Sequence, residues 1–253
     1  MRRRTRSGMR CLTVLLTALW VVAALPAGAD TDDVYDPLER MNRGIWWFND
    51  GVDRYFFEPV AKGWDWVMPD PVQESLKKFY DNASFPITFA NNVLQLKANG
   101  AASTLFRFVI NTTVGLGGFF DPATGLGLNA YPEDFGQTLG YWGVPEGPFL
   151  MLPLLGPSNP RDGIGLAVDS AARVYPWFLV FWINAAITAP DVVNRRALNI
   201  EMIDAEREAA FDWYIAVRNA YVQLRRNQVH DREEEAEEES DDDLYYPDDD
   251  DDS

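Results

Sequence analysis

The chain has 253 residues and a formal net charge of −17, but this charge is unevenly distributed. Fifteen Asp or Glu residues and one Arg lie from Asp231 onwards, whereas the stretch before Asp30 has five Arg residues and no acid. Between Asp30 and His230 the chain has 24 acidic and 16 basic residues. This mildly acidic body argues against a nucleic-acid-binding protein, which would present a basic surface.

One cysteine and one histidine limit the chemistry of the chain. Cys11 lies in the N-terminal basic stretch, and His230 borders the acidic run. These places argue against Ser-His-Asp or Cys-His catalysis and against a His-based metal site. Carboxylate-only catalysis by a hydrolase stays open as an alternative, because several acids lie near the middle of the chain: Glu133, Asp134, Glu146, Asp162 and Asp169. We expect a binding protein with no enzyme activity, no cofactor and no metal.

The first 29 residues have the pattern of an export signal. Five arginines precede or border an apolar run from Leu12 to Leu25, and Ala27-Gly28-Ala29 offers small residues for cleavage. An uncleaved membrane anchor is the alternative, but it needs about 20 apolar residues. Because Cys11 precedes the apolar run, we expect no lipid attachment. The predicted organisation is a signal peptide at 1–29, a helical domain at 30–230 and an acidic disordered tail at 231–253.

The first predicted helix begins near Asp36-Pro37, where Asp36 is a candidate cap and Pro37 suits the first helical position. Seven apolar residues form one stripe on a helical wheel, which we expect to face the core: Leu38, Met41, Ile45, Phe48, Val52, Tyr55 and Phe56. Trp46 and Trp47 lie outside this stripe. Both are membrane-embedding candidates at a bilayer interface, with cation–π stacking on nearby arginines as the alternative. Glu58-Pro59 is expected to end the helix.

The region from Asp70 to Ala130 predicts further helices rather than strands. Apolar residues recur at helical spacing after Asp70-Pro71, from Ile87 to Leu96 and from Ala101 to Asn111. The glycine-rich stretch 112–130 lacks the spacing and the lysine of a phosphate-binding loop, so we expect no nucleotide site there. The fold class is therefore predicted to be all-α.

The stretch from Phe135 to Asp162 is rich in glycine and proline, yet it carries large apolar side chains. Proline fixes φ and glycine permits positive φ, so we expect a rigid, irregular wall that neither continues as a helix nor pairs as a strand. Helix capping is the alternative role for Arg161 and Asp162. The candidate wall residues are Phe135, Gly136, Gln137, Thr138, Leu139, Gly140, Tyr141, Trp142, Gly143, Gly147, Pro148, Leu152, Pro153, Gly156, Pro157, Ser158, Arg161 and Asp162.

A second apolar stretch follows Pro176. From Trp177 to Ala189 the chain is apolar on nearly every side, which indicates burial in protein or in lipid. It is too short to span a bilayer of about 30 Å, so we predict a helical hairpin that dips into one leaflet, with a buried core helix as the alternative. Its membrane-embedding candidates are Trp177, Phe178, Phe181 and Trp182. One long helix, with Arg218 and Arg225 on its polar face, is expected to end near Asn227.

Three sets of residues carry a family resemblance. They are Asp36-Pro37-Leu38-Glu39-Arg40-Met41-Asn42-Arg43, the run from Phe108 to Asp121, and Phe135-Gly136-Gln137-Thr138-Leu139-Gly140-Tyr141-Trp142-Gly143-Val144 with Gly147-Pro148, Leu152-Pro153, Gly156-Pro157-Ser158 and Arg161-Asp162. In this order they resemble the VacJ/MlaA family from about Asp36 to Asn227. The resemblance implies a ring-like all-α protein in the inner leaflet of the bacterial outer membrane, with a polar central channel.

The resemblance also implies a function and partners. Family members take mislocalised phospholipids from the outer leaflet of the outer membrane, pass them to the periplasmic carrier MlaC, and associate with trimeric porins. The stretch 135–162 then becomes a candidate channel wall, with polar residues such as Gln137, Thr138 and Arg161 meeting a lipid headgroup. A porin-associated structural protein without transport activity is the alternative. Many members carry a lipobox cysteine, and this sequence departs from them there.

Overall fold

The computed structural model describes residues 34–172 and 181–230, and these residues are mostly helical, as the sequence predicts. The elements, in chain order, are α2 (Glu39–Val52), the π-helical η1 (Asp53–Phe57), α3 (Glu58–Val67), α4 (Asp70–Ala83), α5 (Phe85–Leu94), α6 (Ala98–Thr113), α7 (Pro122–Gly125), α8 (Phe135–Tyr141), β1 (Leu150–Leu152), β2 (Gly156–Ser158), α9 (Pro160–Ala172), α10 (Phe181–Leu198), α11 (Ile200–Ala209) and α12 (Trp213–His230).

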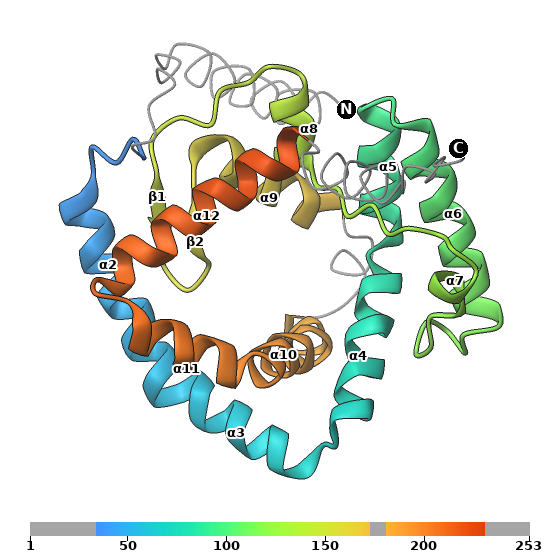
Figure 1. Cartoon of the computed structure of the whole chain (residues 1–253), viewed down its shortest axis with the longest axis horizontal. Helices are drawn as coiled ribbons and strands as arrows, with labels where there is room; N and C mark the ends of the chain where they lie inside the picture. The colour runs from blue at the N-terminus through green and yellow to red at the C-terminus, as the bar shows by residue number, and fades with distance from the viewer. Residues whose placement is uncertain (1–33, 173–180, 231–253) are drawn as a thin grey trace, which may run out of the picture.

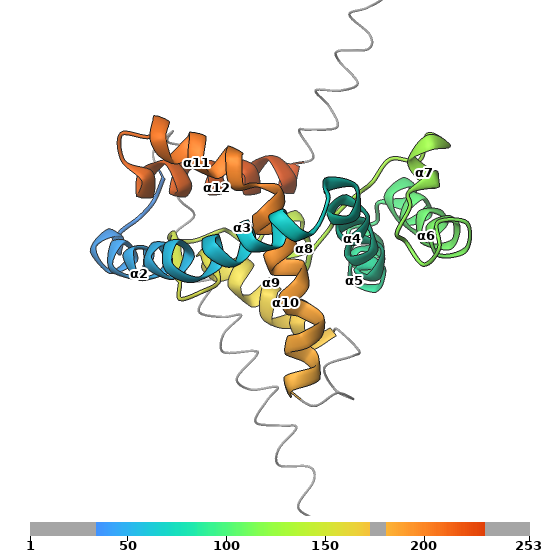
Figure 2. The ribbon, with the colours of Figure 1, turned by 90° about the horizontal axis from the view of Figure 1, so that it is seen from below.

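The helices are arranged as a ring (Figure 1). Helices α2 and α3 follow one side of it, α4 and α5 the next, and α8, α9 and the two strands close it. Helix α10 packs against α3 and α4, whereas α6 and α7 lie outside α5. In the perpendicular view, α11 and α12 lie on one side of the layer that contains α2 and α3, and α10 extends to the other (Figure 2). The ring-like all-α fold is the one that the sequence predicts.

The interior combines a small apolar core with many buried amides. The core consists of Phe149, Met151, Tyr214 and Val222, with Trp46 packed against it. Hydrogen bonds from the buried amides to backbone carbonyls or polar side chains satisfy their donors and connect separate segments. The fully buried amide side chains are Asn42, Gln73, Asn92, Gln95 and Asn194.

Asn194 sets the position of α10 inside the ring. Its side-chain nitrogen donates to the backbone oxygen of Gln73 at 2.8 Å, and its oxygen accepts the indole N–H of Trp64 at 3.0 Å. One buried amide therefore joins α10 to α3 and α4 at once. Among the described helices, none is both long enough and apolar enough to cross a membrane.

The prediction that Glu58-Pro59 ends the first helix is wrong. The chain stays helical from Glu39 to Val67, because the π-helical turn η1 lies directly before Pro59. Within it, the N–H of Glu58 donates to the backbone oxygen of Asp53, five residues earlier. Proline lacks an N–H and its ring crowds the preceding turn of a regular α-helix. The wider π turn accommodates that ring at the start of α3.

The prediction that the first apolar stripe faces the core is also wrong for most of its members. Leu38, Met41 and Phe48 are 42%, 49% and 47% exposed, whereas Asn42, one helical turn after Leu38, is fully buried. The buried side of this helix thus combines Asn42 with Ile45 and Trp46, which pack against the core, while most of the apolar stripe is exposed. Helical spacing identifies the stripe correctly, but it does not determine whether water, protein or lipid covers it.

Asp36 does not cap α2 as predicted. The helix begins at Glu39, and the Asp36 carboxylate instead accepts hydrogen bonds from the Asn42 amide at 2.8 Å and from the Tyr214 hydroxyl. Arg218 of α12 adds an ion pair at 3.3 Å. This carboxylate therefore fastens α12 to the start of α2.

The expected single C-terminal helix is two helices. Helix α11 ends at Ala209 and α12 begins at Trp213. The Asp212 carboxylate accepts the backbone N–H of Ile215 in the first turn of α12, and it also pairs with Arg43 at 2.8 Å. Such a side-chain cap starts a new helix, which continues to His230 rather than ending near Asn227.

Candidate functional site

The stretch 135–162 contains a short strand pair, which corrects the prediction that none of it would pair. Strands β1 and β2 are antiparallel, with Met151 opposite Pro157. Proline has no N–H to donate, but the Met151 N–H points the other way and donates to the Asn42 side chain at 3.0 Å. A proline is therefore tolerated at this position of the pair.

Two asparagines of α2 hold this hairpin against the ring. The Asn42 amide donates to the Phe149 carbonyl at 3.0 Å. Asn49, seven residues later on the same face, donates to the Leu152 carbonyl at 2.9 Å and accepts the Leu154 N–H at 2.8 Å. The turn between the strands, which includes Leu154 with φ of 62°, is thus fixed to α2 by side-chain hydrogen bonds.

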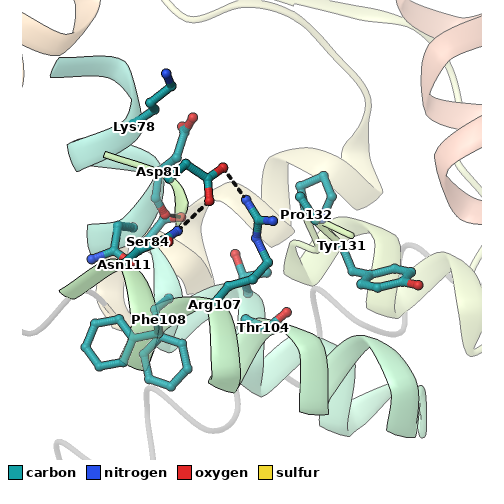
Figure 3. A pocket seen from close by; sticks show the side chains of 14 residues that line it. Lys78, Asp81, Ser84, Thr104, Arg107, Phe108, Asn111, Tyr131 and Pro132 are labelled. Atoms are coloured by element: carbon teal, nitrogen blue, oxygen red, sulfur yellow. Dashed lines mark hydrogen bonds and ion pairs between the residues drawn. The ribbon is translucent and has the colours of Figure 1, made fainter. Parts of the chain in front are cut away.

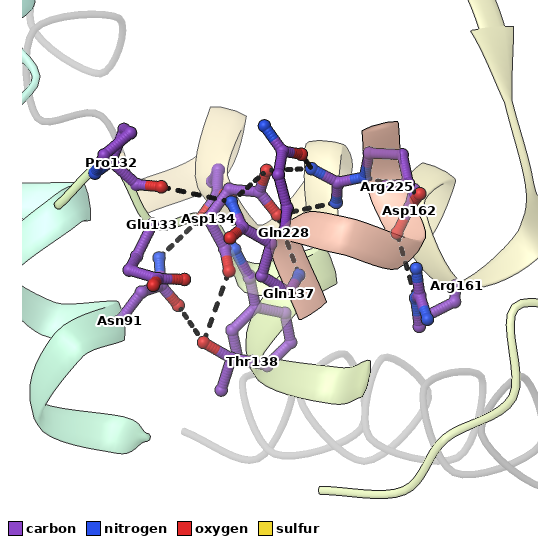
Figure 4. A network of polar contacts seen from close by, with 12 residues as sticks. Asn91, Pro132, Glu133, Asp134, Gln137, Thr138, Arg161, Asp162, Arg225 and Gln228 are labelled. Carbon is purple, nitrogen blue, oxygen red and sulfur yellow. Dashed lines mark hydrogen bonds and ion pairs between the residues drawn. The ribbon is translucent and has the colours of Figure 1, made fainter. Parts of the chain in front are cut away.

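Arg225 of α12 lies between two carboxylates from different elements (Figure 4). Its Nε donates to Asp162 of α9 at 2.9 Å, and its Nη1 and Nη2 donate to Asp134, before α8, at 2.7 and 3.0 Å. Asp162 also accepts hydrogen bonds from Tyr221 and Asn159, both at 2.7 Å. We call these five residues the Arg225 junction, since they join α8, α9 and α12.

The charges of the junction stabilise one another. Burial raises the pKa of the Asp162 carboxyl, but the hydrogen bond and charge of Arg225, with the charge of Arg161, lower it to about 2. Burial likewise raises the pKa of Asp134, and the contacts with Arg225 bring it below its ordinary value. Burial and the nearby Asp162 raise the pKa of the Tyr221 hydroxyl. Both carboxyls are therefore ionised at neutral pH and hold no proton for general acid catalysis.

Two glycines allow α8 and α9 to meet at this junction. A Cβ atom on Gly165 would lie 2.4 Å from the backbone nitrogen of Gly136, and one on Gly136 would lie 2.7 Å from both Arg225 Nη2 and Asp162 Oδ1. Any larger side chain would push the two helices apart. The glycine content of the stretch thus serves close packing as well as bends.

A second polar group joins the other side of α8 to α5. The Thr138 hydroxyl donates to Asn91 at 2.8 Å and accepts from Gln95 at 3.1 Å. Gln95 also donates to Glu133 at 2.8 Å, and Lys97 forms an ion pair with Glu133 at 2.6 Å. Helix α8 is therefore braced by polar contacts on both sides.

The structure places the predicted polar wall residues inside the protein. Gln137, Thr138, Ser158, Arg161 and Asp162 are each buried. Their hydrogen bonds run to other protein groups, although Nη2 of Arg161 has no partner among the described residues. The cap of α9 is Asn159, whose side-chain oxygen accepts the Asp162 N–H at 2.8 Å. These residues shape the wall through their contacts with one another.

The remaining wall candidates divide between packing and bends. Leu139 is buried, whereas Tyr141 and Trp142 are about half exposed at 49% and 52%. Gly143, Gly147 and Gly156 adopt positive φ of 86°, 73° and 84°, as expected for glycine in such bends. The other members are partly exposed or lie at the surface: Phe135, Gly140, Pro148, Leu152, Pro153 and Pro157. Gly136 is buried within the α8–α9 contact.

The five acidic residues that made a carboxylate-only enzyme an alternative all form hydrogen bonds or ion pairs with other parts of the protein. Asp134 and Asp162 belong to the Arg225 junction, and Glu133 pairs with Lys97. Glu146 pairs with Arg226 of α12 at 2.8 Å. Asp169 accepts the backbone N–H of Phe135 at 2.9 Å. Each of these carboxylates therefore helps to connect two segments of the ring.

Exposed apolar side chains occur on α2, η1, α3 and α6, and we call them the apolar rim. Met41 and Phe48 are seven residues apart and thus share one face of α2. Within this rim, Tyr55 and Trp66 are the most exposed, each at 88%. Apolar groups concentrated in this way indicate a surface that contacts a membrane or another protein. The rim consists of Met41, Trp47, Phe48, Tyr55, Phe56, Trp66, Val67, Leu105, Phe106 and Val109.

The two tryptophans of α2 differ in their surroundings. Trp47 is 74% exposed and belongs to the rim. Trp46 is partly buried and packs against the core, with its ring centroid 6.2 Å from that of Tyr214, and its membrane contact stays a prediction. Trp177 and Phe178 lie outside the described residues. Phe181 and Trp182 begin α10.

Arg225 is the main site residue that the sequence analysis missed. We expected it on the solvated face of the last helix, yet it is 9% exposed. Its partners lie 63 and 91 residues away along the chain, so no local spacing signals the junction. Asn42 and Asn49 were missed as well, because asparagine at a helix surface is ordinarily solvated.

These features define a class: a helical ring with a polar, internally braced wall and an apolar rim. The MlaA lipoprotein family model matches residues 34–228, and the chain belongs to this family. The chain is 36% identical over 231 residues to the intermembrane phospholipid transport system lipoprotein MlaA of Haemophilus influenzae, with 86% of this chain and 90% of that protein covered. The Escherichia coli K12 protein of the same name is 32% identical over 220 residues, covering 85% and 86%.

A solved structure has the same architecture. It comes from work on the structural basis for maintenance of bacterial outer membrane lipid asymmetry. The two chains superpose with a TM-score of 0.67 at 34% sequence identity, covering 77% of this chain and 98% of the other. The resemblance drawn from the sequence motifs is thereby confirmed.

Proposed function

We propose that this protein acts in intermembrane phospholipid transport at the bacterial outer membrane. It takes mislocalised phospholipids from the outer leaflet and passes them to the periplasmic carrier MlaC, and so maintains lipid asymmetry. The observation that carries this proposal is the apolar rim around a ring whose inner contacts are polar. A rim of this kind suits a ring seated in lipid, because the apolar side chains then leave water. The names of the similar proteins from H. influenzae and E. coli support the lipid as cargo.

The wall at 135–162 would hold the ring open during lipid passage. Its braces are the Arg225 junction on one side of α8 and the Thr138 contacts on the other. A wall fixed at both sides keeps its shape without help from the cargo. Lipid groups would then meet the exposed parts of the stretch, such as Tyr141 and Trp142, rather than its buried polar side chains. This role is binding and movement of lipid, not catalysis.

The proposed location is the periplasmic face of the outer membrane, next to a trimeric porin. Residues 1–29 would direct export and be removed. Cys11 precedes the apolar run of this signal, so retention would depend on the rim and on porin contact rather than on acyl chains. Washing outer-membrane vesicles with carbonate tests this point: the protein should stay in the pellet, and its release would contradict retention by the rim.

A deletion strain tests the transport role. Outer-leaflet phospholipid should rise when the gene is removed and return to the parental level when it is restored. A porin-associated structural protein without transport activity would leave outer-leaflet phospholipid unchanged, which would contradict the proposal. Hydrolysis of phospholipid by the purified protein would favour the carboxylate enzyme instead, and the variants Asp162→Asn and Glu146→Gln would identify its acids.

A further inference from the structure

A cavity of about 290 Å³ lies away from the wall, between α4, α5, α6 and the segment before α8 (Figure 3). Its lining comes from four parts of the chain, so it is a feature of the tertiary fold. Pockets for complete drug-sized ligands begin at about 300 Å³. This cavity therefore suits a small group, such as the headgroup of a larger molecule.

The charges around the cavity leave one cation without a partner. Arg107 is neutralised by Asp121 at 2.7 Å, and Asn111 donates to the same carboxylate at 2.9 Å. Asp81 is paired with Arg195 at 2.7 Å. Lys78 has no ion pair with any residue that the structure describes. The cavity thus offers a single uncompensated positive charge.

The other lining groups are polar in one part and aromatic in another. The hydroxyls of Thr88 and Thr104 line the cavity and make no hydrogen bond within the described chain. Phe85 and Phe108 stack with ring centroids 4.1 Å apart and planes at 13°. Lys78 lies at one end of the cavity and Phe108 at the other (Figure 3). A ligand that fits would carry an anion, hydrogen-bonding oxygens and an apolar part.

We propose that this cavity binds the phosphodiester headgroup of a glycerophospholipid. The monoanionic phosphate lies at Lys78, its oxygens or the glycerol oxygens accept from the two threonine hydroxyls, and the start of the acyl chains lies against the Phe85–Phe108 pair. On a different side of α6 from Phe108, the exposed Leu105, Phe106 and Val109 of the apolar rim would contact the rest of the acyl chains outside the cavity. The inference relies on the proposed function for its choice of a lipid, but it adds a site separate from the wall.

Calorimetric titration of the purified full-length protein with a short-chain phosphatidylglycerol tests the site. Lys78→Ala should weaken binding about five-fold, the loss of one partly exposed charge contact. Thr104→Val, which keeps the side-chain shape, should weaken it about three-fold. Lys77→Ala is the matched control, because Lys77 has the same charge on the same helix but pairs with Asp81 and does not line the cavity. It should change affinity less than about two-fold.

Several outcomes would overturn the proposal. Equal losses for Lys77→Ala and Lys78→Ala would indicate general surface attraction, and inorganic phosphate binding as tightly as the lipid would indicate a free-phosphate site. Lys78→Arg keeps the charge and should retain binding, so its failure would also contradict the assignment. Thermal melts of each variant exclude unfolding as the cause. Because binding is measured without transport, loss of Lys78 dependence refutes the cavity site alone, and unchanged outer-leaflet phospholipid in the deletion strain refutes the transport role alone.

Discussion

Two clusters of arginines and carboxylates hold the ring together, and they differ in how fully they are satisfied. In the Arg225 junction both carboxylates and the Arg225 guanidinium have partners. Asp162 accepts from Arg225, Tyr221 and Asn159, and also from the neighbouring Arg161, whose Nη2 is the one atom at this contact without a partner among the described residues. The exposed fractions of the Arg225 and Asp162 side chains are 11% and 7%. A buried network of this kind rigidifies the contact it spans.

The second cluster surrounds η1 and consists of Asp50, Asp53, Glu58, Arg196 and Arg207. Asp53 binds Arg196 through two bonds of 2.8 and 3.0 Å and Arg207 at 3.1 Å. Three buried atoms here have no hydrogen bond to any residue that the structure describes, namely Nη1 of Arg196, Nε of Arg207 and Oδ1 of Asp50. We call this group the η1 cluster.

The difference follows from the number of partners per charge. In the junction one arginine serves two carboxylates, so removing it leaves both without their main counter-charge. In the η1 cluster two arginines share Asp53, so either can partly replace the other. We therefore expect the junction to hold α8 and α9 rigidly. The η1 cluster, which links α2, α10 and α11, should tolerate the loss of one of its arginines better.

Arg225→Met should have the largest effect on stability. It leaves the buried Asp162 and the partly exposed Asp134 without the arginine, and breaking a buried pair such as Arg225–Asp162 costs about 3–5 kcal/mol of unfolding free energy. Urea unfolding of the purified protein in detergent measures the loss. Arg226→Met is the matched control on the same helix, since its pair with Glu146 is more exposed and should contribute less than about 1 kcal/mol. Similar losses for both variants would contradict a special role for the junction.

Gly165→Ala should destabilise the same contact through crowding. The new Cβ would lie 2.4 Å from the Gly136 backbone nitrogen, which cannot rotate away, so a cost of about 1–3 kcal/mol is expected. Gly163→Ala serves as the control within α9, because the nearest atom to its Cβ would be Ser158 Oγ at 3.8 Å. That change should be neutral or stabilising, since alanine favours a helix over glycine. Thermal melts that fall equally for both would contradict close packing at Gly165.

Acid should weaken the junction through Asp162. Its folded pKa of about 2 lies below the ordinary carboxyl value of 3.8, so its contribution is complete above about pH 5 and is lost as pH falls toward 2. The shift corresponds to about 2 kcal/mol. Urea midpoints measured between pH 5 and 2.5 should fall for the wild type and fall less steeply for Asp162→Asn. Parallel curves for the two proteins would contradict this account.

Much of the fold follows from local signals in the sequence. Periodicity and the Asp-Pro and Gly-Pro dipeptides locate most helices and the irregular stretch 135–162. The incorrect predictions have physical causes. The apolar stripe of α2 was expected to face a protein core, as it would in a water-soluble protein. In this ring the amides of Asn42 and Asn49 face inward instead.

Less of the candidate site could be predicted from the sequence. The stretch 135–162 was identified, but its polar residues were expected to meet a ligand, whereas they are buried against one another. Arg225 reaches its partners only because α12 folds back over α8 and α9, and a contact between such distant residues leaves no periodic signal. Likewise, Lys78 and Phe108 line one cavity only because α4 and α6 pack around it.

The η1 cluster should show the smallest stability change, and it gives the sharpest comparison with the junction. In Arg196→Met, Asp53 keeps Arg207 at 3.1 Å, and the unpaired Nη1 of Arg196 is removed at the same time. Methionine fills a similar volume, so we expect a loss of about 1 kcal/mol, well below that of Arg225→Met. Removing both Arg196 and Arg207 should then cost more than the sum of the single losses, because only the double variant leaves Asp53 unpaired. A double-mutant cycle from urea unfolding measures this coupling. If the losses of unfolding free energy were strictly additive, the two arginines would not substitute for each other as partners of Asp53.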